Sequence, residues 1–294
     1  MESLVSICVV SYNSAGTILE TLDSIKGQTY KNIELIISDD NSKDNTVEIA
    51  TEWLKNNSNR FTNTQLLTVE KNSGVTGNCN RAVKASKGEI VKIIAADDIF
   101  YPDYIESCTE YFLQNPECNV LFTKLTPFLE NDKTDVISLP EDYDFLQLTQ
   151  QEQHDRLIYN GLTILPTPAC IYRKKILEQM NYFDEEIPMW EDGPMYFKLA
   201  ENNIKMHLLD KEGIFYRISR NSISNKRPVS HVISISKFYF KYRDKYEKKN
   251  NFLKATYHRI KFHFGLHYKN KIARIIYDLT ENHAVKQFDF SKKE

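Results

Sequence analysis

Short apolar runs that alternate with helical patterns fill the first 123 residues, and they constrain the fold more than any other feature. The runs at residues 5–10, 33–38, 64–70, 89–95 and 120–123 have the length and composition of buried parallel strands. A stretch of helical pattern separates each run from the next. Strands joined by helices in this way form parallel, right-handed crossover units. The sequence therefore predicts an α/β fold built on a doubly wound, mostly parallel sheet flanked by helices.

Beyond residue 123 the pattern loosens before regular elements return. Residues 125–153 are acidic, contain proline and show no clear periodicity, so we expect a long connection there. The elements predicted after it are strands at 168–172, 205–209 and 214–218 and helices at 173–180 and 190–202.

Composition and charge describe an ordinary globular chain with an unusual end. No apolar run approaches the ~20 residues that span a bilayer, and the first residues lack the basic stretch of a signal peptide. Five scattered cysteines without a Cys-x-x-Cys pair suit a reducing cytoplasm and no zinc cage. The net charge of −2 is unevenly distributed: residues 237–275 carry +10, and the remainder of the chain carries −12. We therefore expect one domain over 1–230 and a basic, aromatic-rich helical extension over 231–294.

Polar clusters follow three of the predicted strands at the point where each strand ends. Tyr12 follows the first strand, Asp39 and Asp40 follow the second, and Asp97 and Asp98 follow the fourth. Ligands of such sheets bind beyond the carboxyl ends of the strands, so these side chains should meet at one edge. Two adjacent carboxylates repel each other and lose hydration when buried, which favours a divalent cation that also holds phosphate oxygens. A doublet that only caps the next helix is the alternative.

Six short motifs occur in a fixed order along the chain. They are the segments at 5–13 and 28–42, then Asn72-Ser73-Gly74, Asn80, Asp97-Asp98 and Glu191-Asp192. In this order they resemble the family 2 glycosyltransferases, which have the GT-A fold. The resemblance covers residues 4–225, and it implies a nucleotide-sugar donor, a divalent metal (Mg²⁺ or Mn²⁺) and transfer with inversion.

The resemblance also implies roles for individual residues. It places Asp98 on the metal and Asp97 nearer the ribose, although this adjacent pair departs from a strict Asp-x-Asp spacing. It makes Asp40 the residue that reads the imide of uracil or thymine, while capping of the following helix is the alternative role. It implies that Arg217 or Arg220 contacts the diphosphate, and a solvated surface arginine is the alternative. The other donor-binding residues that it implies are Val10, Tyr12 and Asn80.

Glu191 and Asp192 form a second acidic pair at the start of a predicted helix. Negative charge is favoured there by the helix dipole and by free backbone N–H groups, so a plain N-cap is one interpretation. The resemblance implies instead a catalytic pair in which Asp192 takes the proton from an acceptor hydroxyl as it attacks the anomeric carbon. Two neighbouring carboxylates should also raise the pKa of one of them.

The extension allows three interpretations. Aromatic residues alternate with lysine and arginine through 237–275, which favours peripheral contact with an anionic membrane surface. A helical bundle packed on the catalytic domain, with aromatic rings inward and lysines in solvent, is the alternative. Nucleic-acid binding uses similar chemistry, but no other feature of the sequence supports it.

The resemblance thus predicts a metal-dependent, inverting glycosyltransferase in the cytoplasm, on the inner face of the membrane. We expect a UDP-sugar donor and a saccharide or lipid-linked saccharide acceptor of a bacterial capsule or O-antigen. A sugar-1-phosphate nucleotidyltransferase is an alternative, but it would need a glycine-rich, basic phosphate loop where residues 11–16 stand. A non-catalytic sugar- or lipid-binding relative of the fold is the other alternative, against which Asp98 and Asp192 argue.

Overall fold

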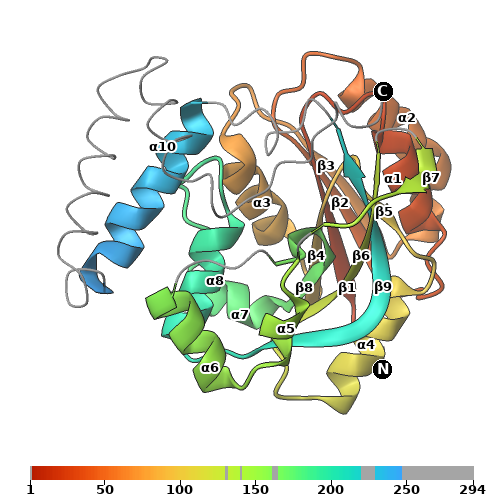
Figure 1. Ribbon diagram of the computed structural model, residues 1–294. Helices are drawn as coiled ribbons and strands as arrows, with labels where there is room; N and C mark the ends of the chain where they lie inside the picture. The colour runs from red at the N-terminus through yellow and green to blue at the C-terminus, as the bar shows by residue number, and fades with distance from the viewer. Residues whose placement is uncertain (1, 130–131, 140, 161–164, 220–228, 247–294) are drawn as a thin grey trace.

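The computed structural model describes residues 2–129, 132–139, 141–160, 165–219 and 229–246. These residues form one mixed sheet of nine strands with helices packed against it (Figure 1). The strands are β1 (Val5–Ser11), β2 (Ile33–Asp39), β3 (Asn63–Leu67), β4 (Ile90–Ala95), β5 (Ile99–Phe100), β6 (Val120–Leu129), β7 (Asp132–Val136), β8 (Cys170–Arg173) and β9 (Met206–Ile218). Their order across the sheet is β3-β2-β1-β4-β8-β6-β9-β5, and β7 pairs with β6.

The first half of the sheet is the parallel unit that the sequence predicts. β1 lies between β2 and β4, all three are parallel, and β3 adds to β2 in the same direction. Ile7 and Val9 of β1 belong to one hydrophobic core and Cys8 to another, because successive side chains face opposite sides of the sheet. Both faces are therefore buried, which explains the continuous apolar runs. The helices of this half are α1 (Ile18–Lys26), α2 (Thr46–Asn57), η1 (Ser58–Arg60) and α3 (Gly74–Ala85).

The second half of the sheet differs from the prediction in three respects. β8 lies antiparallel between β4 and β6, and residues 125–153 contain much of β6, all of β7 and two short helices instead of a plain connection. β9 is one strand where two were predicted. It pairs with β6 along its length through register shifts that let both strands bend, so its polar residues 210–213 lie within the strand. The helices of this half are α4 (Tyr104–Gln114), α5 (Tyr143–Gln147), α6 (Gln150–Asp155), η2 (Arg156–Asn160), η3 (Thr167–Ala169), α7 (Lys174–Gln179) and α8 (Asp192–Glu201).

The described part of the C-terminal extension packs on the body of the protein. It consists of α10 (Val229–Phe238) and the π-helical turn η4 (Tyr239–Arg243), which lie beside α8 in Figure 1. Phe238 is fully buried, and its ring centroid lies 5.6 Å from that of Phe197 on α8. Residues 247–275 of the basic segment lie outside the described residues, so its membrane contact stays a prediction, as does the division into two domains. None of the helices in the described ranges has the length and apolarity to cross a bilayer.

Candidate active site

Asp97 and Asp98 lie in the turn between β4 and β5, next to β9. The short strand β5 pairs with β9 and brings Arg217 beside this turn. The Arg217 N–H donates to the Asp98 carboxylate at 3.0 Å, and its Nε donates to the Asp97 carbonyl at 2.9 Å. The Arg217 guanidinium also lies 3.2 Å from the Glu20 carboxylate on α1. One arginine therefore joins α1, β9 and the acidic turn.

The Asp97-Asp98 pair carries more negative charge than the surrounding protein compensates. Burial raises the pKa of Asp98 well above its usual range, and the charge of Asp97 raises it further. Contacts with Arg217 and the charge of Lys92 act in the opposite direction without cancelling the shift. Burial also raises the pKa of Asp97, against the lowering effect of Arg217. A cation beside the pair would therefore stabilise both ionised carboxylates.

These two aspartates fit the metal role predicted for them. Mg²⁺ and Mn²⁺ prefer oxygen ligands, and Mg²⁺ takes only one or two protein carboxylates where substrate phosphates supply others. One oxygen of Asp98 accepts the Arg217 N–H, and among the described residues the other accepts no hydrogen bond. The described ranges contain no group of three or more His, Cys, Asp or Glu side chains that could hold a metal ion. Asp98, with Asp97 beside it, is thus the residue that could share a metal with donor phosphates.

Asp192 is the first residue of α8 and contacts the η3 turn that precedes β8. Its two oxygens accept hydrogen bonds from the Thr167 hydroxyl and from the Gly193 N–H, each at 2.7 Å. The Tyr196 hydroxyl donates to Thr167 at 2.9 Å, which fixes the threonine in turn. Glu191 occupies the N-cap position of α8, but its side chain caps no backbone N–H. The plain N-cap interpretation therefore does not describe Glu191.

The pKa shift expected for one of two neighbouring carboxylates falls on Glu191. Burial, and then the charge of Asp192, raise the pKa of Glu191 to about 8. A carboxyl group with this pKa is mostly protonated at pH 7. The proton removes one of two like charges from the start of α8.

A short segment, residues 167–170, contacts Asp192 directly and contacts β4 through Lys92. The buried Lys92 of β4 donates from Nζ to the carbonyl oxygens of Pro168 and Cys170, the latter at 3.0 Å. Burial lowers the pKa of Lys92 to about 8, against the opposing charge of nearby acidic groups that include Asp98. At the start of the same segment Thr167 binds Asp192. β4, which leads into the Asp97-Asp98 turn, and the first turn of α8 are thus both bound to residues 167–170.

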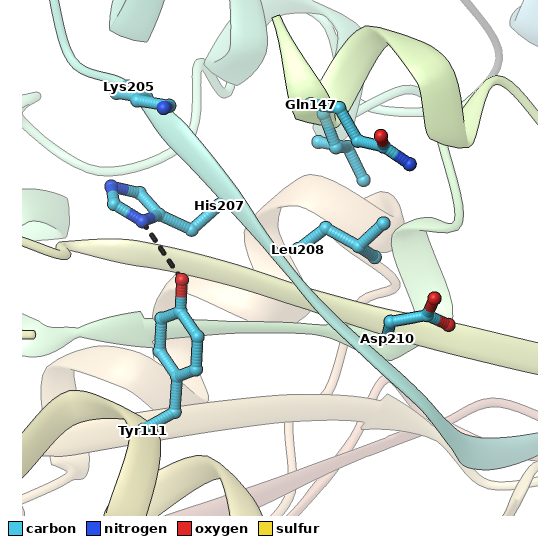
Figure 2. A pocket seen from close by; sticks show the side chains of 7 residues that line it. Tyr111, Gln147, Lys205, His207, Leu208 and Asp210 are labelled. Carbon is cyan, nitrogen blue, oxygen red and sulfur yellow. Dashed lines mark hydrogen bonds between the residues drawn. The ribbon is translucent and has the colours of Figure 1, made fainter. Parts of the chain in front are cut away.

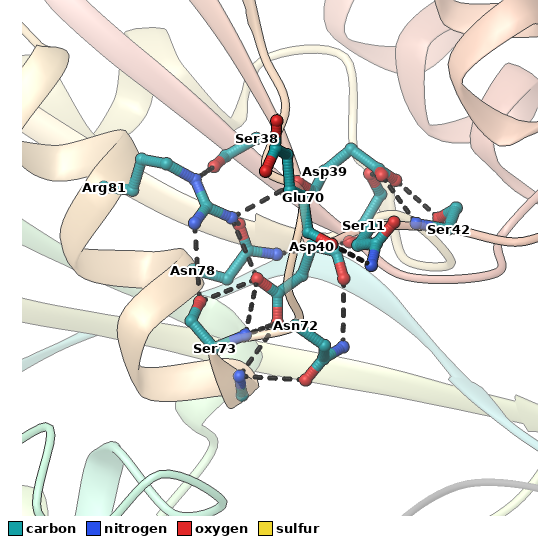
Figure 3. A network of polar contacts seen from close by, with 12 residues as sticks. Ser11, Ser38, Asp39, Asp40, Ser42, Glu70, Asn72, Ser73, Asn78 and Arg81 are labelled. Atoms are coloured by element: carbon teal, nitrogen blue, oxygen red, sulfur yellow. Dashed lines mark hydrogen bonds and ion pairs between the residues drawn. The ribbon is translucent and has the colours of Figure 1, made fainter.

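Asp40 follows β2 directly and lies in the polar network of Figure 3. Its carboxylate accepts hydrogen bonds from the Ser73 N–H at 2.9 Å, the Ser73 hydroxyl at 2.7 Å and the Gly74 N–H at 2.8 Å. It also forms an ion pair with Arg81 at 3.1 Å. Gly74 has a φ of 80°, a conformation that favours glycine. Asp40 therefore caps α3, and not the helix that directly follows it in the sequence.

The other residues predicted to bind the donor have different surroundings. Val10 is partly buried and Tyr12 is 50% exposed, both at the end of β1. Asn80 is buried on α3, and its amide contacts the loop at residues 183–185 through three hydrogen bonds. Arg220 lies outside the described residues. All of these donor contacts stay predictions, and for Asn80 a donor would compete with contacts inside the protein.

The sequence matches the family model described as "Glycosyl transferase family 2" over residues 6–180. The chain belongs to glycosyl transferase family 2. The matched region runs from β1 to the end of α7, so it contains the Asp97-Asp98 turn and ends before Glu191 and Asp192. The resemblance that the sequence motifs carry is confirmed.

Curated relatives are similar to this chain in sequence, and solved glycosyltransferase structures are similar to it in fold. WfaP of Escherichia coli, named UDP-Glc:alpha-D-GlcNAc-diphosphoundecaprenol beta-1,3-glucosyltransferase, is 32% identical over 227 residues, which cover 75% of this chain and 80% of that protein. TarS of S. aureus in complex with UDP matches with a TM-score of 0.60 and 20% identity, over 98% of this chain and 94% of that one. The mannosyltransferase PcManGT from Pyrobaculum calidifontis, in complex with GDP-Man and Mn²⁺, matches with a TM-score of 0.62 and 17% identity, over 82% of this chain and 64% of that one. The structural matches confirm the predicted GT-A fold.

Three residues that hold the site of this family 2 glycosyltransferase together were missed by sequence reasoning. They are Arg81, which pairs with Asp40, Thr167, which binds Asp192, and Lys92, which holds the turn before β8. A lone lysine inside an apolar strand and a lone arginine in a helix of small residues are signals that could have been used for Lys92 and Arg81. For Thr167 the sequence holds no such signal, because its partner is 25 residues away.

Asp40→Asn is expected to lower the free energy of unfolding by about 2–4 kcal/mol. The change weakens charge-assisted hydrogen bonds to the first turn of α3 and leaves Arg81 without its acidic partner. Urea unfolding of the two proteins measures the difference. Glu52→Gln is the control, because it breaks an exposed ion pair with Lys55 and should change stability by less than about 0.5 kcal/mol. Equal stability of wild type and Asp40→Asn would contradict the structural role of the network.

A groove that Figure 2 shows is separate from both acidic pairs. It has a volume of about 310 Å³ and lies at the start of β9, whereas Arg217 lies near the end of that strand. The Tyr111 hydroxyl and the His207 ring share a hydrogen bond of 3.2 Å in its wall. None of the predicted site residues in the described ranges lines it. The lining residues are Tyr111, Leu146, Gln147, Lys205, His207, Leu208 and Asp210.

Proposed function

We propose that this protein is an inverting glycosyltransferase that moves a hexosyl or hexosaminyl group from a UDP-sugar to a hydroxyl group of a saccharide or lipid-linked saccharide. The observation that carries the proposal is the pair of acidic doublets, Asp97-Asp98 and Glu191-Asp192. Residues 167–170 bind Asp192 through Thr167 and bind Lys92, whose charge acts on Asp98. One doublet suits a metal-bound diphosphate and the other suits proton transfer. Both functions are needed at one reacting carbon.

Asp192 is the general base in this proposal. Hydrogen bonds from Thr167 and Gly193 orient its carboxylate, and each oxygen keeps a lone pair for an acceptor hydroxyl. As the acceptor oxygen bonds to the anomeric carbon, the bond from that carbon to the diphosphate oxygen breaks, and its electron pair leaves with UDP. The acceptor proton passes to Asp192. Attack from the face opposite UDP turns an α-linked donor into a β-glycoside.

Asp98 holds the metal in this proposal, with Asp97 nearer the ribose. A divalent metal bound there would stabilise the charge of the leaving diphosphate as a Lewis acid. Arg217 binds the turn of both aspartates through its backbone and its Nε. Guanidinium matches phosphate geometry, but the buried Arg217 side chain already pairs with Glu20, so it would contact a phosphate only by exchanging that partner. Arg220 would act with it.

The nucleotide base is proposed to bind at the ends of β1 and β2. Tyr12, which is half exposed, offers a ring on which a base can stack, and Val10 lies beside it. Asp40 would read the uracil imide only by exchanging one of its present contacts with the α3 turn. Asn80 would support the donor through the position of α3.

The relatives support a UDP-sugar and a lipid-linked acceptor. WfaP is named for UDP-glucose and for an acceptor on diphosphoundecaprenol, and TarS was solved with UDP. PcManGT was solved with GDP-Man and Mn²⁺, so a GDP-sugar is the alternative donor. We propose that the product belongs to a bacterial surface polysaccharide such as a capsule or O-antigen. Peripheral contact of residues 237–275 with the inner face of the membrane would bring the enzyme to such an acceptor.

A panel of nucleotide sugars tests the proposal. Release of UDP, GDP, TDP and CMP is measured from their sugar conjugates, with Mn²⁺ or with EDTA, and with and without a diphosphoundecaprenol-linked sugar. We expect UDP release that needs Mn²⁺ and rises at least about tenfold with the acceptor. Product formation that is equal in EDTA would contradict the metal role. Release of no nucleotide from any donor would contradict the proposed activity.

A further inference from the structure

The segment just before α8 is bound by α10 of the extension. The Met189 N–H donates to the Ser234 hydroxyl at 3.2 Å, and the His231 ring nitrogen Nδ1 lies 3.1 Å from the Met189 carbonyl oxygen. The next residue, Trp190, packs edge-on against Phe238, with ring centroids 5.0 Å apart. Both backbone groups of Met189 and the Trp190 ring are therefore held by one helix, directly ahead of Glu191-Asp192.

A second set of contacts joins η4 to the start of the same segment. The Lys241 ammonium lies 2.8 Å from the Asp184 carboxylate and 3.0 Å from that of Glu186, and the Tyr242 hydroxyl donates to Asp184 at 2.7 Å. Lys237 donates to the Glu186 carbonyl oxygen at 2.9 Å. Burial alone would raise the pKa of Asp184, but the contacts with Lys241 and Tyr242 lower it below its usual range. Lys241 of the extension thus meets two opposite charges on the body.

The opposite side of this segment rests on α3. The Thr76 hydroxyl donates to the Ile187 carbonyl oxygen at 2.7 Å, and the Thr76 N–H donates to that of Pro188 at 3.2 Å. At the C-terminal end of this segment, Trp190 packs closely on Gly193 of α8. Any side chain at position 193 would overlap the indole ring. The Trp190 ring is therefore in close contact with the first turn of α8, which contains Asp192, and a shift of the ring changes this contact.

We propose that α10 and η4 position the catalytic base. Their contacts with residues 184–190 hold Trp190 against Gly193, and this contact sets the orientation in which Asp192 meets the acceptor hydroxyl. The inference rests on the proposed function, since it concerns the same base. It assigns residues 229–246 to the catalytic unit, in contrast to a boundary at residue 230. Ser234 and Lys241 are positioning residues, because neither touches the reacting atoms.

Four variants test the inference in the full chain. Ser234→Ala and Lys241→Ala remove one contact each, Lys241→Arg keeps the charge, and Lys55→Ala is a matched control that breaks an exposed ion pair on α2. For each variant, kcat and the donor KM are measured from UDP release, and UDP affinity is measured by titration calorimetry with Mn²⁺. Emission of Trp190 reports the docking of α10, in a Trp53→Phe background, since the chain has two tryptophans.

We expect Ser234→Ala and Lys241→Ala to lower kcat about tenfold, with donor KM and UDP affinity within about twofold of wild type. The Trp190 emission should shift in both, Lys241→Arg should restore most of kcat, and Lys55→Ala should match wild type. Unchanged kcat in both alanine variants would overturn the inference, with or without a change in emission. A loss of UDP affinity equal to the loss of kcat would do the same, because it would indicate general disruption. An inactive wild type would overturn the proposed function and this inference with it, whereas an active wild type with active variants overturns the inference alone.

Discussion

Replacing Asp192 by asparagine is expected to lower the rate of sugar transfer by about 10²–10⁴-fold, the usual contribution of a general base. The asparagine amide has nearly the same shape and can still accept the Thr167 hydrogen bond, so the start of α8 should keep its place. It cannot take the acceptor proton. UDP affinity should stay within about twofold of wild type, because Asp192 is proposed to contact the acceptor hydroxyl and not the diphosphate. Steady-state kinetics and calorimetry measure the two effects.

Asp210→Asn is the control for this experiment. Asp210 is an exposed aspartate in an ion pair with Lys124, and it lines the groove at the start of β9. Its replacement should leave the rate of transfer unchanged. Full activity of Asp192→Asn would remove this residue from the mechanism. A loss of activity in Asp210→Asn would indicate that the groove takes part in the reaction.

Replacing Asp98 by asparagine is expected to abolish metal-dependent UDP binding and to lower the rate of transfer at least about a hundredfold. The metal would lose its carboxylate ligand, and its contribution to the transition state is typically several kcal/mol. The folded protein should be at least as stable as wild type. Asparagine still accepts the Arg217 N–H, while the negative charge that burial disfavours is gone.

The pH dependence of stability gives this variant a second readout. Because the pKa of Asp98 is raised in the folded protein, its contribution to stability is present at low pH and is lost as the pH rises through the folded pKa. The stability of Asp98→Asn relative to wild type should therefore increase as the pH rises. Asp103→Asn, which breaks the ion pair of a half-exposed aspartate with Lys211, should leave Mn²⁺-dependent UDP binding unchanged. Equal Mn²⁺-dependent affinity in wild type and Asp98→Asn would exclude Asp98 as the ligand.

Hydrophobic periodicity predicted the first half of the sheet, because each strand and helix there shows its own pattern within a short stretch of sequence. The runs that became β1, β2 and β4 are apolar on both faces, and the helices between them show their own stripes, so both the elements and their parallel order followed. The antiparallel insertion of β8 between β4 and β6 depends on pairing between distant residues, which a local sequence pattern does not indicate. The continuity of β9 through residues 210–213 was missed for a related reason, since a bend supported by β6 resembles a turn in the sequence.

The site followed the same division. The acidic doublets Asp97-Asp98 and Glu191-Asp192 were visible because they interrupt or begin elements where charge has no packing purpose. The residues that orient them, such as Thr167, come from elsewhere in the chain and are defined only by the folded contacts. The pKa shift of the second pair could be expected from two neighbouring carboxylates, but not that burial would place it on Glu191.

A crystal structure with a UDP-sugar and Mn²⁺ is the most direct test of the claim that both acidic doublets serve one transfer reaction. We predict Mn²⁺ bound to Asp98 and the diphosphate, with the anomeric carbon of the sugar facing Asp192 across a space wide enough for an acceptor hydroxyl. A nucleotide bound in the groove beside Tyr111 and His207, or a sugar turned away from Asp192, would contradict the claim.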